Sequence, residues 1–200
     1  MTRLILASSS PRRRELLHNL KAAFEVVAPE EEIEPPLPPR CAEDQVPELA
    51  CSTALTKAVS VARRVEAGSL VLAADTMVLA GERLLGKPQT REEAAAILEL
   101  LSASRHAVIT GVAVVETGSG RQATGYERTE VVFNRLDPQD IRDYVDSGEP
   151  FDKAGAYGIQ GLGGLLVARI EGCYFNVVGL PLSRVDRLLR GFGLRLLRPG

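Results

Sequence analysis

Five consecutive apolar residues, Leu70 to Ala74, are followed directly by Asp75 and Thr76. A continuous apolar run of this length is typical of a strand that helices cover on both faces. Ligands of such α/β proteins lie beyond the ends of strands, so Asp75 is a candidate metal ligand or a general base that activates water. The alternative is an aspartate that stabilises a turn.

Segments of strand and helix character alternate along the rest of the chain. Ser10 and Pro11 suit the first positions of a helix, and Thr90 to Glu93 reads as a capping box. The expected strands are 4–7, 24–27, 70–74, 77–79, 83–85, 106–116, 129–133, 165–170 and 174–178. The expected helices begin at Pro11 and cover about 47–66, 90–101, 137–148 and 182–190, with a loop over 29–40. This pattern predicts one α/β domain over residues 1–200, with a mixed twisted sheet and flanking helices.

Composition narrows the possible partners. The 24 basic and 26 acidic residues give a net charge of −2, and there is no Trp, so we expect no nucleic-acid polymer as a partner. Three cysteines without C-x-x-C spacing and two histidines argue against a disulfide framework or a zinc site. No apolar run approaches the roughly 20 residues that span a bilayer. The apolar stretch at the N-terminus is also too short for a secretory signal. We therefore expect a cytoplasmic protein without a membrane partner.

Basic residues gather where a strand gives way to a helix, in Ser8-Ser9-Ser10-Pro11-Arg12-Arg13. Arginines at a helix N-terminus are locally unfavourable unless an anion binds there, and phosphate is the usual anion at such a junction. Lys87 lies in Gly86-Lys87-Pro88, where the proline restricts Lys87 to an extended backbone that presents its ammonium group. The alternative to phosphate binding is that this turn, Lys87 and Lys57 are ordinary charged residues on the solvated surface.

A glycine-rich stretch covers residues 148–164, with six glycines in seventeen positions. Glycine lets backbone approach a ligand closely, and Gln160 within it offers both a donor and an acceptor to a base edge. A strand is expected after it, so neither the dinucleotide fingerprint nor the P-loop applies. Acidic residues at 30–34 could share a metal with Asp75, or form a solvated charge run.

At these residues the chain resembles the Maf family of nucleoside triphosphate pyrophosphatases, also described as septum formation inhibitors. The matching stretches are in family order and cover nearly the whole chain: 6–13, 57–58, 74–78, 86–88, 129–133, 148–161 and 178–181. The resemblance implies a fold related to the inosine triphosphate pyrophosphatases, with two lobes around a central cleft, and a homodimer. It also implies hydrolysis of a nucleoside triphosphate to the monophosphate and pyrophosphate with a divalent cation, Mg²⁺ or Mn²⁺.

The resemblance also assigns roles by motif. It implies that Asp75 is the proton acceptor and a metal ligand, and that Glu32 is the acidic loop residue that shares the metal. Positions linked to substrate choice are Arg12, Thr76 and Gln160. Positions that line the phosphate site are Ser8, Arg13, Lys57, Lys87 and Lys153. Convergent cations of this kind would offset the roughly four negative charges of a triphosphate.

The segment Ala156-Tyr157-Gly158-Ile159-Gln160-Gly161 looks like the branch that acts on dTTP and UTP. We therefore expect hydrolysis of dTTP, UTP and related or modified pyrimidine nucleotides. Two alternatives stay open at this point. One is a 7-methyl-GTP pyrophosphatase, and the other is a nucleotide-binding regulator of cell division with little hydrolysis.

Overall fold

A single mixed sheet of seven strands runs through the molecule in the computed structural model, which describes residues 2–30, 38 and 40–197. The strands are β1 (Arg3–Leu6), β2 (Glu25–Val26), β3 (Ser69–Ala80), β4 (Arg83–Leu85), β5 (Arg105–Glu116), β6 (Gln122–Phe133) and β7 (Val167–Glu171). The helices are α1 (Pro11–Asn19), α2 (Val46–Ala62), α3 (Arg91–Leu101), α4 (Pro138–Asp146), α5 (Tyr174–Val178) and α6 (Leu182–Gly191). Three short 3₁₀ segments, η1 (Glu149–Asp152), η2 (Ala154–Ala156) and η3 (Gly161–Leu166), precede β7.

The strand order is β2-β1-β3-β5-β6-β7, with β4 paired to β3. β1 runs parallel to β2 and β3, whereas the pairs β3–β5, β5–β6 and β6–β7 are antiparallel. The prediction of a mixed α/β sheet with flanking helices is therefore confirmed.

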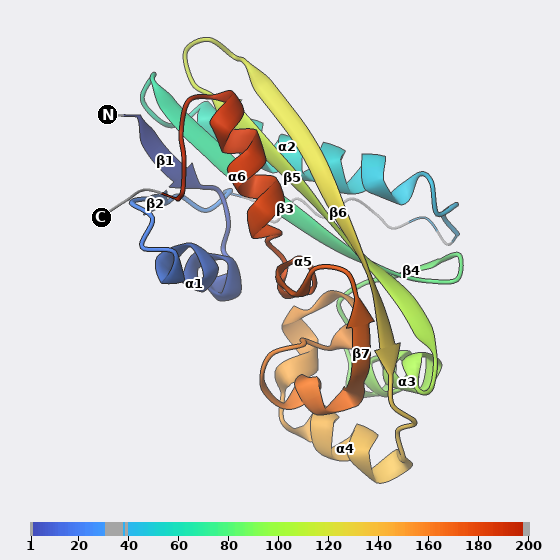
Figure 1. Ribbon diagram of the computed structural model, residues 1–200. Helices are drawn as coiled ribbons and strands as arrows, with labels where there is room; N and C mark the ends of the chain where they lie inside the picture. Colours follow the sequence, from blue (N-terminus) through green and yellow to red (C-terminus); the bar gives the residue numbers. More distant parts are fainter. Residues whose placement is uncertain (1, 31–37, 39, 198–200) are drawn as a thin grey trace.

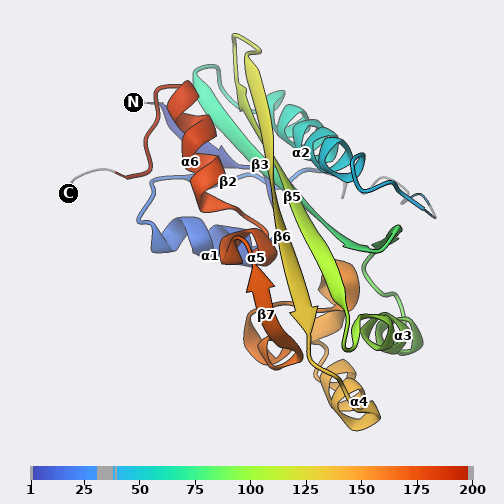
Figure 2. The same cartoon turned by 45° about the vertical axis from the view of Figure 1, so that its right-hand side comes forward.

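Helices cover both faces of the sheet, and side chains of β3 pack against the helices on both of these faces. Leu70 and Leu72 pack in the core that α1 and α6 share, whereas Val71 and Ala73 pack in the core under α2. Figures 1 and 2 show α2 on one side of the long strands and α6 on the other. This double cover explains why the start of β3 is continuously apolar.

The long strands β3, β5 and β6 connect two lobes (Figure 1). One lobe holds β1, β2, α1, α2 and α6, and the other holds α3, α4, β7 and the 3₁₀ segments. The second lobe has a core of its own, in which Leu98 of α3, Ile141 of α4 and Phe133 of β6 are buried. The two lobes expected from the resemblance are present.

One edge of β3 has a gap between the two lobes. β5 occupies the other edge from Leu70 to Leu79. On the gapped edge, β1 pairs with Ser69 to Leu72, and β4 pairs with Val78 to Ala80. Within the described chain, residues 73–77 therefore have no strand partner on this side. This gap contains Asp75 and Thr76.

Several of the strand predictions differ from the structure. The expected strands 70–74 and 77–79 form one continuous strand, β3, so Asp75 lies in the middle of a strand and not beyond its end. Residues 174–178, expected as a strand, form the short helix α5, and the expected strand at 165–170 begins only at Val167, after η3. β6 begins at Gln122, seven residues before the expected strand, because it pairs with β5 along its length. The expected loop over 29–40 lies mostly outside the described residues.

The predicted helix starts are correct in position but differ in detail. Ser10 occupies the N-cap of α1, yet its side chain makes no capping hydrogen bond within the described chain. At α3, Thr90 Oγ1 accepts from Glu93 N at 3.2 Å, but the Glu93 carboxylate accepts from Gln89 N. Only half of the expected capping box is therefore present.

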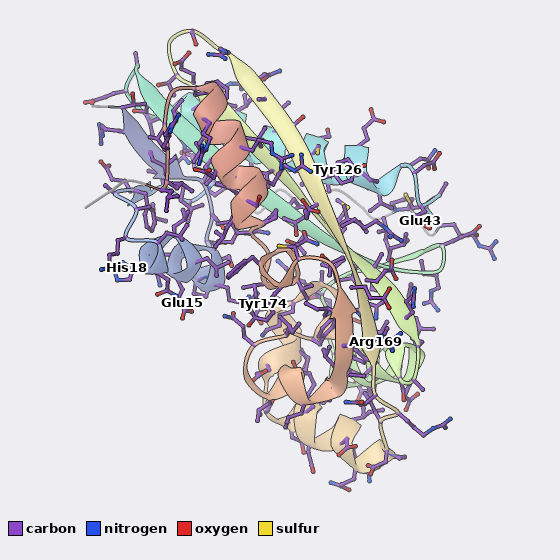
Figure 3. All side chains as sticks on the ribbon, viewed as in Figure 1. Glu15, His18, Glu43, Tyr126, Arg169 and Tyr174 are labelled. Carbon is purple, nitrogen blue, oxygen red and sulfur yellow. The ribbon has the colours of Figure 1, made fainter. Side chains whose placement is uncertain are left out.

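One face of α1 is exposed to solvent, whereas Leu16 and Leu17 on its other face are buried. Glu15 and His18, labelled in Figure 3, are exposed.

Among the described residues, no helix is both long enough and apolar enough to cross a membrane.

Candidate active site

The gap in the β3 edge opens into a cavity of about 560 Å³. Its wall comes from both lobes: the β1–α1 junction and α2 on one side, and the β4–α3 loop and the 3₁₀ segments on the other. All nine described residues to which the family resemblance assigned a role line it: Ser8, Arg12, Arg13, Lys57, Asp75, Thr76, Lys87, Lys153 and Gln160. Residues up to 152 positions apart in sequence thus meet at one cavity.

Asp75 faces α2 because it continues the alternation of Val71 and Ala73. There its Oδ1 accepts from Lys57 Nζ at 2.6 Å, and both side chains are largely shielded, with exposures of 15% and 12%. A lysine this close fixes the position of the carboxylate at the cavity wall. It also places one cation of the proposed phosphate site directly beside the proposed base.

Thr76 points to the opposite face, where α1 presents Arg13. Arg13 Nη2 donates to Thr76 Oγ1 at 3.0 Å, and Arg13 Nε donates to the Gly179 carbonyl at 2.8 Å. A longer contact of 3.5 Å joins Arg13 Nη1 to Ser8 Oγ. Burial lowers the pKa of Arg13 from its usual value, while the nearby carboxylate of Asp75 acts to raise it. A guanidinium keeps its charge under such a shift, so Arg13 is a fixed cation in a shielded position.

Asp152 is a site residue to which the sequence analysis gave no role. Its carboxylate accepts from Arg12 Nη1 at 2.9 Å and from Lys153 Nζ at 2.5 Å. Burial acts to raise the pKa of Asp152, but the hydrogen bonds from Lys153 and Arg12 outweigh it and hold this pKa below its ordinary value. Asp152 therefore stays ionised at neutral pH and holds two of the proposed substrate-binding cations together.

Gln160 is held by the turn that follows it. Gly161 has a φ of +67°, a conformation that favours glycine, and η3 begins there. The Glu149 carboxylate accepts from the backbone N–H groups of Leu162 and Gly163, at 3.1 and 3.4 Å. Glu149 thus stabilises the N-terminus of η3 beside Gln160. The sequence signal for it was only its place in the glycine-rich stretch.

Lys87 lines the cavity beside Gly86, whose carbonyl accepts from Gly155 N at 3.0 Å. This bond ties the Lys87 loop to the glycine-rich stretch. Glu32, the other expected metal ligand, lies outside the described residues. The assignment of Glu32, among the glutamates of 30–32, as the metal ligand therefore stays a prediction.

The donor set at the cavity suits a hard divalent cation that substrate phosphates also hold. The described residues contain no group of three or more His, Cys, Asp or Glu side chains arranged for a metal. Mg²⁺ commonly binds through one or two carboxylates together with phosphate oxygens and waters. Asp75, at the wall of a cavity with several cations, is a carboxylate of that kind.

Comparison with known proteins gives a consistent result. A family model described as "Maf-like protein" matches residues 3–192. A dTTP/UTP pyrophosphatase of Carboxydothermus hydrogenoformans is 47% identical over 193 residues, which is 96% of this chain and 99% of the relative. A dTTP/UTP pyrophosphatase of Moorella thermoacetica is 49% identical over 197 residues, 97% of each chain.

Solved structures are more distant. A HAM1 protein from Coxiella burnetii aligns with 71% of this chain and 90% of its own, at 16% identity and a TM-score of 0.45. A nucleoside-triphosphatase / dITP/XTP pyrophosphatase from Mycobacterium abscessus covers 68% of this chain and 74% of its own, at 18% identity and a TM-score of 0.43.

Proposed function

The chain belongs to the Maf family, and from this premise we propose its activity. It is a nucleoside triphosphate pyrophosphatase that hydrolyses dTTP, UTP and related or modified pyrimidine nucleotides to the monophosphate and pyrophosphate. The observation that carries the proposal is the meeting of all nine described motif residues at one cavity between the lobes. The names of the relatives favour this substrate class over 7-methyl-GTP and favour an enzyme over a binding regulator.

In the proposed reaction, Asp75 accepts a proton from the attacking water. The water oxygen forms a bond to phosphorus as the bond between the α and β phosphates breaks, and pyrophosphate leaves. Lys57, 2.6 Å from Asp75, holds the carboxylate in position throughout. Fixed charges aimed at the developing phosphate charge lower the barrier because they need no reorganisation during the reaction.

The phosphates are bound by cations from both lobes in this proposal. Ser8, Arg13 and Lys57 contact them from the first lobe, and Lys87 and Lys153 from the second. The cavity has five cationic side chains against two carboxylates, which suits a polyanion. Arg12, Thr76 and Gln160 determine which base is accepted, with Gln160 offering a donor and an acceptor to its edge.

We propose that Mg²⁺ or Mn²⁺ acts with the substrate and that Asp75, with Glu32 from the acidic loop, holds it. Bound there, the cation would neutralise phosphate charge and polarise the scissile linkage. The residues themselves supply the remaining steps: Lys57 orients Asp75, and Arg13 holds the phosphates.

We further propose a single catalytic domain over residues 1–200 that works in the cytoplasm as a homodimer. The three cysteines, Cys41, Cys51 and Cys173, are all free, which supports a reducing compartment. The homodimer rests on the family resemblance.

A panel of about twelve nucleoside triphosphates, chosen to vary base and sugar, tests the proposal through initial rates of pyrophosphate release with Mg²⁺ and Mn²⁺. We expect the highest kcat/KM values for dTTP and UTP. A preference for 7-methyl-GTP would contradict the substrate class, and saturable binding without turnover would favour a regulator.

The Asp75→Asn variant tests the role of the base. Asparagine keeps the shape of the side chain but cannot accept the proton, so we expect kcat to fall about 100-fold or more. The matched control is Asp186→Asn, a carboxylate on α6 that pairs with Arg190 instead of lining the cavity, which should leave kcat unchanged. Near-normal turnover by Asp75→Asn would exclude Asp75 as the proton acceptor.

A further inference from the structure

Thr110 lies directly behind the cavity wall, on β5 opposite Thr76 of β3 in the antiparallel register. Its side chain is fully buried, with an exposure of 0%, and it does not line the cavity among the described residues. A buried hydroxyl must be hydrogen-bonded to avoid a desolvation cost, and its partners here connect the cavity wall to α5.

The direction of these hydrogen bonds follows from the chemistry of the groups. Thr110 Oγ1 donates to the Asn176 carbonyl at 3.0 Å, and a carbonyl oxygen can only accept. A hydroxyl has one proton, so in the 3.0 Å contact between Thr76 Oγ1 and Thr110 Oγ1, Thr76 must be the donor. The Thr76 oxygen therefore presents only lone pairs to its other neighbours. One of these lone pairs accepts from Arg13 Nη2 at 3.0 Å.

The same network fixes the second acceptor of Arg13. Asn176 is fully buried on α5, and its Nδ2 donates to the Val108 carbonyl at 2.9 Å and to Thr129 Oγ1 at 3.0 Å. The Asn176 carbonyl, which accepts from Thr110, also accepts from the N–H of Gly179, the residue that caps α5, at 3.0 Å. The Gly179 carbonyl in turn accepts from Arg13 Nε at 2.8 Å. Arg13 thus donates to the Thr76 hydroxyl, which is hydrogen-bonded to Thr110, and to the Gly179 carbonyl, which Thr110 holds through Asn176.

We propose that Thr110 is a positioning residue, which sets the proton direction of the Thr76 hydroxyl and thereby holds Arg13 in place for the substrate phosphates. Without the Thr110 hydroxyl, the Thr76 proton loses its acceptor and is free to point toward Arg13. The Arg13 Nη2–H would then meet a donor in place of a lone pair. The inference rests on the proposed function, because it concerns how one phosphate-binding group of that site is oriented.

The test compares Thr110→Val, which keeps the shape of the side chain without the hydroxyl, with Thr110→Ser, which keeps the hydroxyl. Initial rates with dTTP and Mg²⁺ give kcat and KM, and inorganic pyrophosphate serves as an inhibitor that probes phosphate binding alone. For Thr110→Val we expect kcat/KM to fall about 10-fold or more, since a hydrogen bond to a charged group is misaligned. The pyrophosphate inhibition constant should rise in parallel, and Thr110→Ser should restore both values.

A buried threonine elsewhere supplies the matched control. Thr117 follows β5, where its hydroxyl donates to the Glu66 carbonyl and accepts from Ser69 N, away from the cavity. Thr117→Val should lower the melting temperature without changing either kinetic constant. If Thr110→Val does not fold, Thr110→Ala removes the same hydroxyl without adding a methyl group, and the comparison with serine stands.

Two results would overturn the inference. One is a Thr110→Val enzyme within about twofold of the wild type in kcat/KM and in pyrophosphate inhibition. The other is a Thr110→Ser enzyme as impaired as the valine variant, which would mean that packing and not the hydroxyl matters. A wild-type protein that releases no pyrophosphate from any triphosphate would instead contradict the proposed function itself.

Discussion

His106 is the residue whose ionisation the fold opposes most clearly. It is 2% exposed on β5, its Nε2 lies 2.7 Å from the Tyr157 hydroxyl, and its ring packs edge-on against Phe133. Burial lowers the pKa of His106 to about 4, so the imidazole is neutral in the folded protein at neutral pH. In the unfolded chain a histidine has a pKa of about 6.5. Between these values the unfolded chain binds a proton that the folded chain does not.

Stability should therefore fall as the pH is lowered from about 6.5 toward 4, by up to about 1.4 kcal/mol per pH unit from this residue. His106→Gln removes the titrating group, so its free energy of unfolding should depend less on pH across this window. Urea titrations at several pH values measure the free energy of unfolding of both proteins. Titration of the carboxylates contributes equally to both, so the difference between them reports His106. His18→Gln, a change at the exposed histidine, should behave like the wild type. Parallel curves for His106→Gln and the wild type would refute the prediction.

At the scale of elements, the contact between α2 and β5 determines the position of Lys57. Gly111 of β5 lies opposite Asp75 in the register, and a Cβ there would come within 2.3 Å of the Ala50 carbonyl carbon of α2. Only glycine permits this close approach. Gly111→Ala should thus displace α2 and with it Lys57, which contacts Asp75 at 2.6 Å.

We expect Gly111→Ala to lower the free energy of unfolding by about 1–3 kcal/mol or more. Turnover should also fall by about 10-fold or more, because a small misplacement of a catalytic group is costly. Gly191→Ala is the matched control, since nothing lies within 4 Å of a Cβ at that end of α6. Chemical denaturation and initial rates measure both effects. A Gly111→Ala enzyme with normal stability and turnover would show that α2 can shift without disturbing the pair.

Elements that local pattern determines were predictable from the sequence, and those that long-range bonds determine were not. The apolar run 70–74 predicted a doubly covered strand, which β3 is. Residues 174–178 have the aromatic and β-branched composition of a strand, yet they form α5. The reason is tertiary: Thr129 Oγ1 accepts from Cys173 N and from Asn176 Nδ2, which fixes a helical turn against β6.

The site shows the same division. Motif residues identified the members of the cavity wall, because each motif is a short continuous stretch. Asp152 was missed as a partner because the arginine that it binds, Arg12, is 140 positions away. Thr110 carries no sequence signal at all, since it is one residue in a long β-branched strand. Its importance comes only from the register that places it behind Thr76.

At the scale of the whole molecule, the charge of the cavity opposes the charge of the protein. The net charge is −2, whereas the described cavity wall has five cations and two carboxylates. A triphosphate thus meets little attraction at long range but a strong positive field within the cleft. Screening by salt acts on that field over a distance of about 10 Å at 0.1 M ionic strength and about 3 Å at 1 M.

Raising the ionic strength should therefore weaken substrate binding far more than it slows the chemical step. We expect KM for dTTP to rise several-fold between about 0.05 and 0.5 M KCl, while kcat changes less, because the bound substrate is shielded from the solvent. Initial rates at fixed free Mg²⁺ measure both constants.

Two variants show whether the cavity cations cause this salt dependence. The Arg169→Gln variant changes an exposed cation on β7 that pairs with Glu171, so it should show the same salt dependence as the wild type. The Lys153→Gln variant should show a weaker dependence, because one of the cavity cations that salt screens is missing. A KM that does not change with salt would contradict the prediction. It would mean that partners within the protein, such as Asp75 and Asp152, already neutralise the cavity cations before the substrate binds.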